Sequence, residues 1–163
     1  MKFFIDKSFN NSFDKIIAID PLISDDGKLN KVDYDKYVEY CNSEYLIECD
    51  ELMIPIIMKL NKKGYVTKYC CSGHISPVCC GPNNVGLAND SCYIVFDETV
   101  ELDSIPEGFN VKPVNNGLCV YRNIDDMSLD IREELRICNR FDEILYAIQK
   151  LRHWSTELPS LRD

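Results

Sequence analysis

A dense group of cysteines around a single histidine is the strongest chemical feature of the sequence. The segment Cys70-Cys71-Ser72-Gly73-His74 is followed a few residues later by Cys79-Cys80. Thiolates and imidazoles bind soft metal ions, and a thiolate beside an imidazole is a common nucleophile. We therefore expect the functional site in the long Cys/His loop at residues 70–90, because long irregular stretches inside compact domains are usually functional or disordered.

One interpretation of this loop is a zinc site. Cys71 and His74 are separated by two residues, and Cys79 or Cys80 would extend the ligand set. Soft thiolate and imidazole ligands suit zinc, although this spacing differs from that of zinc fingers and zinc ribbons. A structural zinc-binding module is therefore one of the functions that the sequence leaves open.

Two other interpretations use the same loop without a metal. In the first, Cys71 is a catalytic nucleophile and His74 is the imidazole that lowers the pKa of its thiol. In the second, the backbone amides of Ser72 and Gly73 bind a small anionic or nucleotide-like ligand, with Lys68 as a positive group nearby. An ordinary tight turn between half-buried cysteines is the remaining alternative.

The direction of the side chains follows from the strand that leads into the loop. Neighbouring residues of a strand point to opposite faces, so Cys71 and His74 are expected to line one pocket while Cys70 points into the core. Gly73 is expected to resist substitution, because it supplies a positive φ or a close approach of the backbone.

Several β-strands are predicted around this loop. Residues 65–70 and 92–96 are rich in β-branched and aromatic side chains, which favour strands. Residues 111–114 and 118–121 flank an Asn-Asn-Gly turn and indicate a hairpin, and the proline in the first of them places it at a sheet edge. Residues 15–19 are expected to form a buried strand or a short helix.

Three helical segments are predicted from apolar residues at helical spacing. The first covers residues 33–41. The second covers residues 49–62, with Asp50 as N-cap, although Pro55 favours a start near the residue before it. The third is C-terminal, with a fresh start at Asn139, and its apolar stripe is Ile131, Leu135, Cys138, Leu145, Ile148 and Leu151.

These elements predict an α+β fold with an antiparallel or mixed sheet flanked by helices. The chain has 163 residues, of which 45% are hydrophobic and 28% are charged, which is ordinary for one globular domain. We expect a single domain over residues 1–163. Residues 1–48 would be its N-terminal part, and residues 49–163 a helix–strands–helix body that carries the Cys/His loop.

Residues 60–74 resemble one stretch of the wybutosine-synthesis tRNA methyltransferase family. In that family a helix ending near Leu-Asn precedes a Tyr-x-Thr strand and a Ser-Cys-Ser-Gly-Arg turn. Cys71-Ser72-Gly73 matches the centre of that turn, whereas Cys70 replaces its first serine and His74 its arginine. The resemblance implies an α+β fold with a ligand pocket at the turn, and S-adenosylmethionine or a nucleotide as ligand. It does not imply methyl transfer to tRNA.

The charge of the chain bears on its partners. With 18 basic and 27 acidic residues the net charge is −9, which repels nucleic-acid phosphates, so direct nucleic-acid binding is not expected. A basic run just before the Cys/His loop is interpreted as a solvated helix end. Its members are Lys59, Lys62, Lys63 and Lys68.

The nine cysteines bear on the compartment. The first residues form no secretory signal, and no apolar run is long enough to span a bilayer. We therefore expect a cytoplasmic protein with reduced thiols and no membrane partner.

Whether the protein is an enzyme is left open. The first hypothesis is a protein or enzyme that binds a small anionic or nucleotide-like molecule in the Cys/His loop. A second is an acidic, non-catalytic inhibitor of the kind that phage-type genomes encode, which would block a basic nucleic-acid-binding protein of the host. The zinc module is the third.

Overall fold

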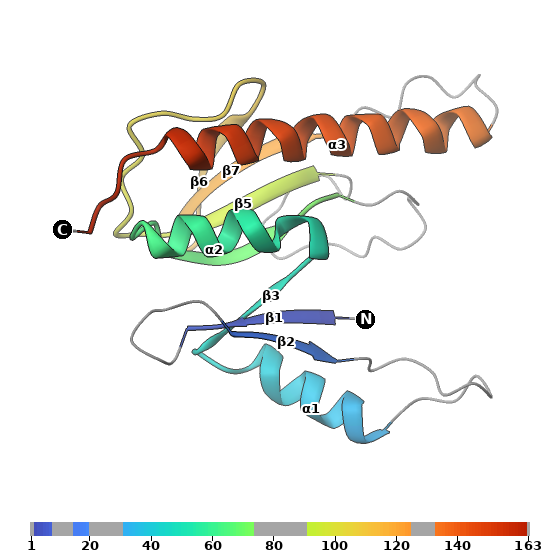
Figure 1. Ribbon diagram of the computed structural model, residues 1–163, viewed down its shortest axis with the longest axis vertical. Coiled ribbons are helices and arrows are strands. Elements are labelled where there is room, and N and C mark those ends of the chain that lie inside the picture. The colour runs from blue at the N-terminus through green and yellow to red at the C-terminus, as the bar shows by residue number, and fades with distance from the viewer. Residues whose placement is uncertain (1, 8–14, 20–30, 74–90, 125–132, 163) are drawn as a thin grey trace.

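The structure, a computed structural model, describes residues 2–7, 15–19, 31–73, 91–124 and 133–162 (Figure 1). These residues form an α+β domain with two antiparallel sheets, which confirms the predicted fold class. One hydrophobic core contains residues of both sheets, such as Ile5 and Ile47 from the first and Ile94 and Phe96 from the second.

The first sheet has three strands in the order β2-β1-β3. They are β1 (Lys2–Asp6), β2 (Lys15–Ile19) and β3 (Leu46–Cys49). The strand alternative for residues 15–19 is therefore correct, but burial is confined to Ile19, because β2 lies at the sheet edge. Strand β3 was not predicted, and it replaces the first residue of the expected helix 49–62.

The second sheet has four strands in the order β4-β5-β7-β6. They are β4 (Thr67–Cys71), β5 (Ser91–Asp97), β6 (Asn110–Val114) and β7 (Gly117–Asn123). The predicted hairpin is confirmed as β6–β7, and β6 lies at the edge, as its proline indicated. Asn116 in the turn has a positive φ of 58°, which asparagine tolerates better than most residues.

The helices are α1 (Lys31–Cys41), α2 (Ile54–Lys62) and α3 (Glu133–Glu157), with a short 3-10 turn η1 (Glu51–Met53) before α2. Pro55 falls in the first turn of α2, as expected. Asp50 is the N-cap residue of η1, as predicted for this helical segment, with an extended backbone at φ −68° and ψ 147°. Its side chain makes no capping hydrogen bond there.

Helix α3 is continuous through Asn139, so the predicted fresh start there is wrong. The predicted apolar stripe is confirmed at Ile148 and Leu151, which are buried, but Cys138 is exposed and Leu145 is 41% exposed. The residues that pack inward recur at the three- and four-residue spacing of one helix face. They are Ile144, Ala147, Ile148, Leu151 and Trp154.

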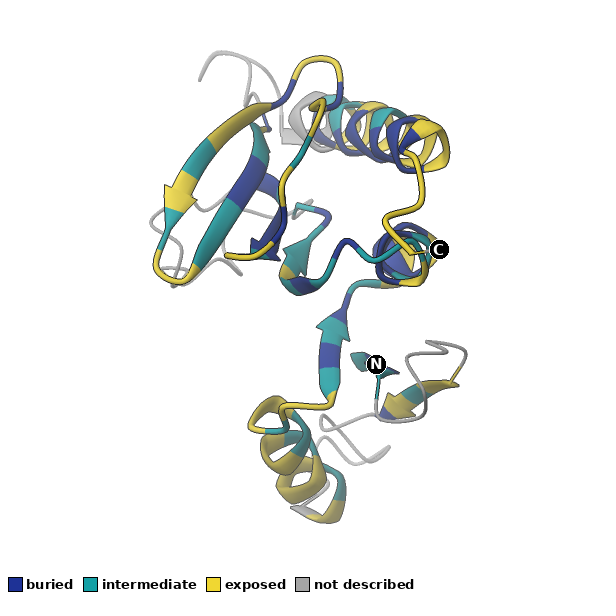
Figure 2. Cartoon of the chain, turned by 90° about the vertical axis from the view of Figure 1, so that its left-hand side faces the viewer, coloured by how far each residue is buried: buried dark blue, intermediate teal, exposed yellow. Residues whose placement is uncertain are grey.

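Helices α2 and α3 cover the same face of the four-stranded sheet (Figures 1 and 2). The rings of Phe96 on β5 and Trp154 on α3 meet edge to face with centroids 6.1 Å apart. Helix α1 packs on the smaller sheet, where the buried ring of Phe4 contacts Tyr37 and Tyr40. The four-stranded sheet is therefore covered by α2 and α3, and the three-stranded sheet by α1.

The turn from α2 into β4 is held by Asn61, a fully buried side chain. Its Nδ2 donates to the Ile57 carbonyl at 2.8 Å and to Thr67 Oγ1 at 2.7 Å, while its Oδ1 accepts from the Thr67 amide at 3.1 Å. Gly64 between them has a φ of +98°, a conformation that glycine adopts at little cost. These hydrogen bonds fix the start of β4. They thereby also fix the position of the turn at Ser72 and Gly73, which follows β4.

The basic run of the sequence is largely engaged inside the fold. Lys63 Nζ donates to the Ser155 and Thr156 carbonyls at 2.9 and 2.7 Å, and Lys59 Nζ donates to Thr156 Oγ1. Cations at a helix C-terminus complement its dipole, so these lysines hold the end of α3 against α2. Lys68 lies apart from them on β4.

Among the helices that the structure describes, none combines the length and the apolar character needed to cross a membrane.

The Asn61 joint predicts a large and local loss of stability. Asn61→Ala leaves buried partners without hydrogen bonds, so we expect the free energy of unfolding to fall by about 3 kcal/mol. Asn42→Ala is a matched control, because Asn42 Nδ2 donates to the Val38 carbonyl at 2.8 Å in an exposed position. That variant should lose less than about 1 kcal/mol. Urea unfolding curves of both variants check the difference, and equal losses would contradict it.

Candidate functional site

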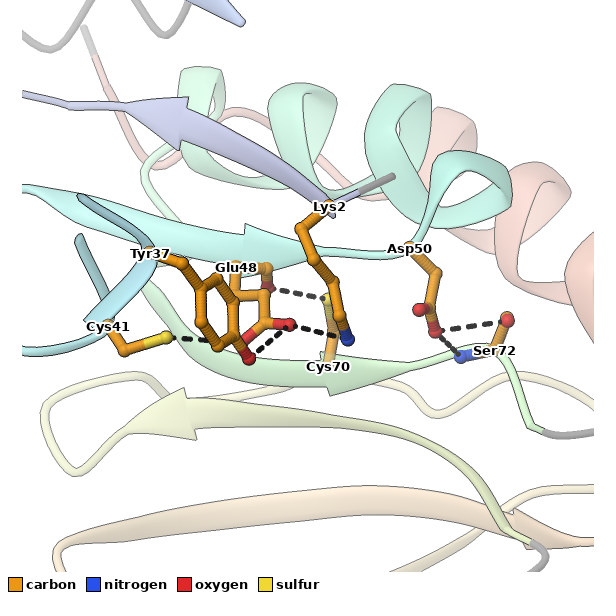
Figure 3. A network of polar contacts seen from close by, with 7 residues as sticks. All are labelled: Lys2, Tyr37, Cys41, Glu48, Asp50, Cys70 and Ser72. Atoms are coloured by element: carbon orange, nitrogen blue, oxygen red, sulfur yellow. Dashed lines mark hydrogen bonds and ion pairs between the residues drawn. The ribbon is translucent and has the colours of Figure 1, made fainter. Parts of the chain in front are cut away.

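The two sheets face each other at β3 and β4, which run in the same direction (Figure 3). Cys70 Sγ lies 3.6 Å from the Glu48 carbonyl, and the Ser72 amide lies beside Asp50, so positions 48 and 50 match positions 70 and 72. The chain passes from one strand to the other through α2, which makes a crossover between parallel neighbours. The carboxyl ends of both strands therefore meet at one place, where ligands commonly bind in parallel arrangements.

The ends of β3 and β4 are joined by a carboxylate. Asp50 Oδ2 accepts from the Ser72 amide at 2.7 Å and from Ser72 Oγ at 3.1 Å. Gly73 follows with a φ of +98°, and a Cβ there would lie 3.2 Å from Ile124 Cγ1 and 3.3 Å from Ile144 Cγ1. The positive φ expected for Gly73 is confirmed. This conformation strains any other residue, and the contacts with Ile124 and Ile144 leave little room for a Cβ.

A cavity of about 290 Å³ opens between the two sheet edges. Residues from β1, α1, β3, β4 and β5 contribute to its wall. Thiols, tyrosines and charged groups dominate the lining: Lys2, Tyr40, Cys41, Leu46, Glu48, Cys49, Asp50, Lys68, Tyr69, Cys70, Cys71 and Tyr93. The cavity therefore contains four of the nine cysteines of the chain.

One wall of the cavity is organised around the Glu48 carboxylate (Figure 3). Lys2 Nζ lies 3.1 Å from Oε1, the Tyr37 hydroxyl donates to both oxygens at 3.3 Å, and Cys41 Sγ lies 3.6 Å from Oε2. Burial and this carboxylate raise the pKa values of Tyr37 and Cys41. Both groups therefore keep their protons and act as donors to Glu48.

The opposite wall carries Lys68 of β4. Its Nζ lies 3.1 Å from Asp97 Oδ2 and donates to the Asn116 carbonyl at 2.7 Å. Hydrogen bonds from Thr99 and Lys68 lower the pKa of Asp97, so this carboxylate is ionised at neutral pH.

The thiols of Cys70 and Cys71 are neutral at physiological pH. Burial raises the pKa of Cys71 to about 12, with a further contribution from the Asp50 carboxylate. The hydrogen bond to the Cys49 thiol, followed by burial, raises the pKa of Cys70 well above its usual value. Burial also raises the pKa values of Cys92 and Tyr93. Since a nucleophile must be a thiolate, Cys71 is not activated by the groups that the structure places around it.

Some of the predicted site residues are described by the structure, and these lie at the cavity. Cys71 and Lys68 line the cavity, and Ser72 lies at its end through Asp50. The Ser72 amide, assigned to an external anion, donates in the structure to the carboxylate of the protein itself. Cys70 packs against the hydrophobic core, as expected, but it also lines the same cavity as Cys71.

Three further residues named in the sequence analysis lie outside the described residues. They are His74, Cys79 and Cys80. The proposed pairing of His74 with Cys71 and the proposed zinc ligands therefore remain predictions. Among the residues that the structure describes, no three His, Cys, Asp or Glu side chains are grouped closely enough to hold a metal ion.

The structure adds residues that the sequence did not single out. Lys2, Glu48, Cys49 and Asp50 come from β1, from β3 and from the residue after it, and Tyr93 comes from β5. A signal for β3 was present in Leu46-Ile47-Glu48-Cys49, which alternates in burial along the chain. Recognition of that strand would have placed Asp50 at a strand end beside the predicted turn.

No protein-family model, curated protein or solved structure matches this chain.

The Asp50–Ser72 contact yields a prediction about stability. Asp50→Ala removes the acceptor of two hydrogen bonds, so the free energy of unfolding should fall by about 2–3 kcal/mol, whereas Ser72→Ala should cost about 1 kcal/mol. The double variant should cost about as much as Asp50→Ala alone, because the two residues share one contact. Glu51→Ala, an exposed acidic neighbour, is the control and should stay within about 0.5 kcal/mol. Strictly additive losses in urea unfolding would disprove the contact.

The raised thiol pKa values predict a loss of stability in alkali. The pKa of a cysteine thiol in the unfolded chain is about 8.5, while the pKa of Cys71 in the folded protein is about 12. Between these two pKa values the folded state binds more protons than the unfolded state. The contribution of the protonated thiol to the free energy of unfolding is therefore complete below the pKa of the unfolded chain. It is lost as the pH rises toward the pKa of the folded state. The slope approaches about 1.4 kcal/mol per pH unit for each such thiol.

The measurement is urea unfolding between pH 7 and pH 10, run under reducing conditions. Cys71→Ala should show a smaller loss across this range, whatever its stability at pH 7. Cys138→Ala, at an exposed position on α3, should retain the wild-type slope. A slope unchanged by Cys71→Ala would mean that this thiol is not protected in the fold.

Proposed function

We propose that the protein binds one small anionic or nucleotide-like molecule in the cavity between β3 and β4. The observation that carries this proposal is the balance of hydrogen-bonding groups in the cavity wall. Its acceptors are already used by the protein, whereas several of its donors are protonated groups that can turn to a ligand.

The acceptors are the two carboxylates. Glu48 accepts from Lys2, Tyr37 and Cys41, and Asp50 accepts from Ser72. A cationic ligand would have to displace these partners, at the cost of leaving buried or half-buried groups unpaired. The cavity is therefore poorly suited to a cation despite the net negative charge of the chain.

The donors are the ammonium groups and the protonated hydroxyl and thiol groups. Lys68 donates to Asp97 and Asn116 in the described contacts, and an ammonium carries three protons, so one is left for a ligand. Tyr93 lines the cavity with a raised pKa and stays protonated at neutral pH. A ligand rich in acceptors, such as a phosphate ester or a carboxylate with a heterocycle, fits this wall.

The size of the cavity limits the ligand. Pockets for drug-sized molecules span roughly 300–1,000 Å³, and this one measures about 290 Å³. It suits a mononucleotide or a smaller acid better than a dinucleotide. The resemblance of residues 60–74 to the wybutosine-synthesis methyltransferases adds S-adenosylmethionine to the compounds to be tested.

Binding is favoured over covalent catalysis by the neutral state of Cys71. The alternatives of an acidic phage-type inhibitor and a zinc module have no supporting contact among the described residues, so they stay as outcomes of the experiment. An inhibitor would gain stability from a basic protein alone, and a zinc module would lose stability with a chelator.

The test is a thermal-shift and calorimetric screen of the reduced protein with nucleoside monophosphates, S-adenosylmethionine and small phosphate esters. A binder at about one hundred times its Kd should stabilise the fold by about 2.7 kcal/mol. For that compound, Lys68→Gln and Tyr93→Phe should each weaken binding about tenfold, since each removes one hydrogen bond worth roughly 1.4 kcal/mol.

Matched controls come from the same sheet. Lys112→Gln changes a lysine of β6 and Tyr121→Phe changes the residue paired with Tyr93 across β5 and β7, and neither residue lines the cavity. Both control variants should bind the compound as the wild type does. Equal effects of the cavity and control variants, or no stabilisation by any anionic compound, would overturn the proposal.

A further inference from the structure

Two thiols from different sheets touch inside the cavity. Cys49 Sγ at the end of β3 and Cys70 Sγ on β4 lie 3.6 Å apart. Cys49 is 3% exposed, whereas Cys70 is only partly buried, and both line the cavity. The contact joins the facing edges of the two sheets, which no strand pairing connects in the described part of the chain.

We propose that Cys49 and Cys70 form a reversible dithiol–disulfide site that reacts with small disulfide compounds, of which glutathione disulfide is the type. A disulfide bond has a sulfur–sulfur distance of about 2.05 Å, so the two sulfurs must approach by about 1.5 Å. Rotation of the side chains supplies this movement, and it breaks only the weak contacts of Cys70 Sγ with the Glu48 carbonyl and of Cys49 Sγ with the Asp50 carbonyl.

The reaction has two balanced steps. The Cys70 thiol, whose raised pKa makes this step slow at neutral pH, first loses its proton. The resulting thiolate attacks one sulfur of the small disulfide, which forms a mixed disulfide and releases one thiolate. The Cys49 thiolate then attacks Cys70 Sγ, which forms the Cys49–Cys70 bond and releases the second thiolate. The protons lost by the two cysteines pass to the released thiolates, so the small disulfide is reduced to two thiols while the protein dithiol is oxidised.

The order of the steps follows from exposure. Cys70 is the more accessible of the pair and is reached through the cavity, whereas Cys49 is enclosed and can attack only a partner already in place. Cys71, the neighbour of Cys70, accepts a hydrogen bond from the Gly73 amide at its Sγ, 3.4 Å away, and this contact holds it toward the turn. The geometry therefore selects Cys49 as the resolving thiol.

Oxidation would change the same region that forms the cavity. The bond would close a loop from residue 49 to residue 70, which includes η1 and α2, and would clamp β3 to β4. A cysteine whose thiol has a raised pKa is a poor leaving group, and the pKa of Cys70 is raised by its contact with Cys49 and by burial. Once formed, the disulfide is therefore expected to reopen slowly.

The experiment treats the reduced full-length protein with glutathione disulfide, blocks the remaining thiols by alkylation and maps the peptides after digestion with trypsin. Lysines between residues 49 and 70 separate the two cysteines into different peptides. One peptide also contains Cys41, and the other also contains Cys71, Cys79, Cys80, Cys92 and Cys119. Fragmentation of the linked peptides by tandem mass spectrometry therefore identifies the bonded cysteines. We expect a linked pair of peptides that contains Cys49 and Cys70, and a higher melting temperature for the oxidised protein.

Variants assign each step. Cys49→Ser should accumulate glutathione on Cys70, because the resolving thiol is missing, and Cys70→Ser should form neither product at residue 49. Cys71→Ser should still form the linked pair, which excludes the neighbouring thiol. Cys138→Ser changes an exposed cysteine on α3 and should behave as the wild type.

Linkage of Cys70 to a cysteine other than Cys49 would overturn the proposal. So would full alkylation of Cys49 and Cys70 under conditions in which Cys138 is already glutathionylated. If Cys49→Ser fails to fold, the peptide map of the wild-type protein still decides the outcome. Disulfide formation is measured without any cavity ligand, so its failure is distinct from a failure of the proposed ligand binding.

Discussion

The hydrogen bonds from Ser72 to the Asp50 carboxylate are the constraint on which the site depends. They hold together the ends of two strands that belong to different sheets and that exchange no ladder hydrogen bonds in the described structure. A carboxylate can accept from an amide and a hydroxyl at once, and hydrogen bonds to a charged group are stronger than those between neutral groups. This contact holds the ends of β3 and β4 together, while the cavity opens between the two sheet edges.

That open space explains the chemistry of the cavity. If the two edges paired like neighbouring strands of one sheet, backbone amides and carbonyls would fill the gap. Instead, the Cys70 thiol approaches the Glu48 carbonyl and the Cys49 thiol. A thiol is a small and weak donor. It therefore contacts the edge of β3 without filling the space between β3 and β4. Cysteine at these positions is consistent with a gap that stays accessible.

The cavity contains positively charged groups although the chain as a whole is negatively charged. The net charge of −9 describes the surface at long range, whereas Lys2 and Lys68 bring positive charge to the cavity. Each lysine lies beside a carboxylate, Glu48 or Asp97, so neither charge is buried alone. The local charge of the cavity therefore differs from the net charge of the chain, and the proposed binding of an anionic molecule rests on this difference.

The lysines of α2 serve a different purpose from those of the cavity. Lys59 and Lys63 hold the end of α3, and this use inside the fold explains a basic run that would otherwise suggest a nucleic-acid contact. Together with Asn61, these side chains fix α2 between α3 and β4. The position of the turn at Ser72 therefore depends on packing some distance away from it.

The sequence by itself determined the α+β class, most of the strands and the importance of Gly73, because period, turn residues and β-branched side chains act locally. It also singled out Cys71 and Lys68, which line the cavity in the structure. It could not place Cys49, Glu48 or Lys2 there, because their role arises from contacts between strands far apart in the chain. It placed Asp50 correctly at the N-cap position, but it could not show what the carboxylate binds. In the tertiary structure this carboxylate accepts from Ser72, 22 residues further along the chain, and makes no capping hydrogen bond.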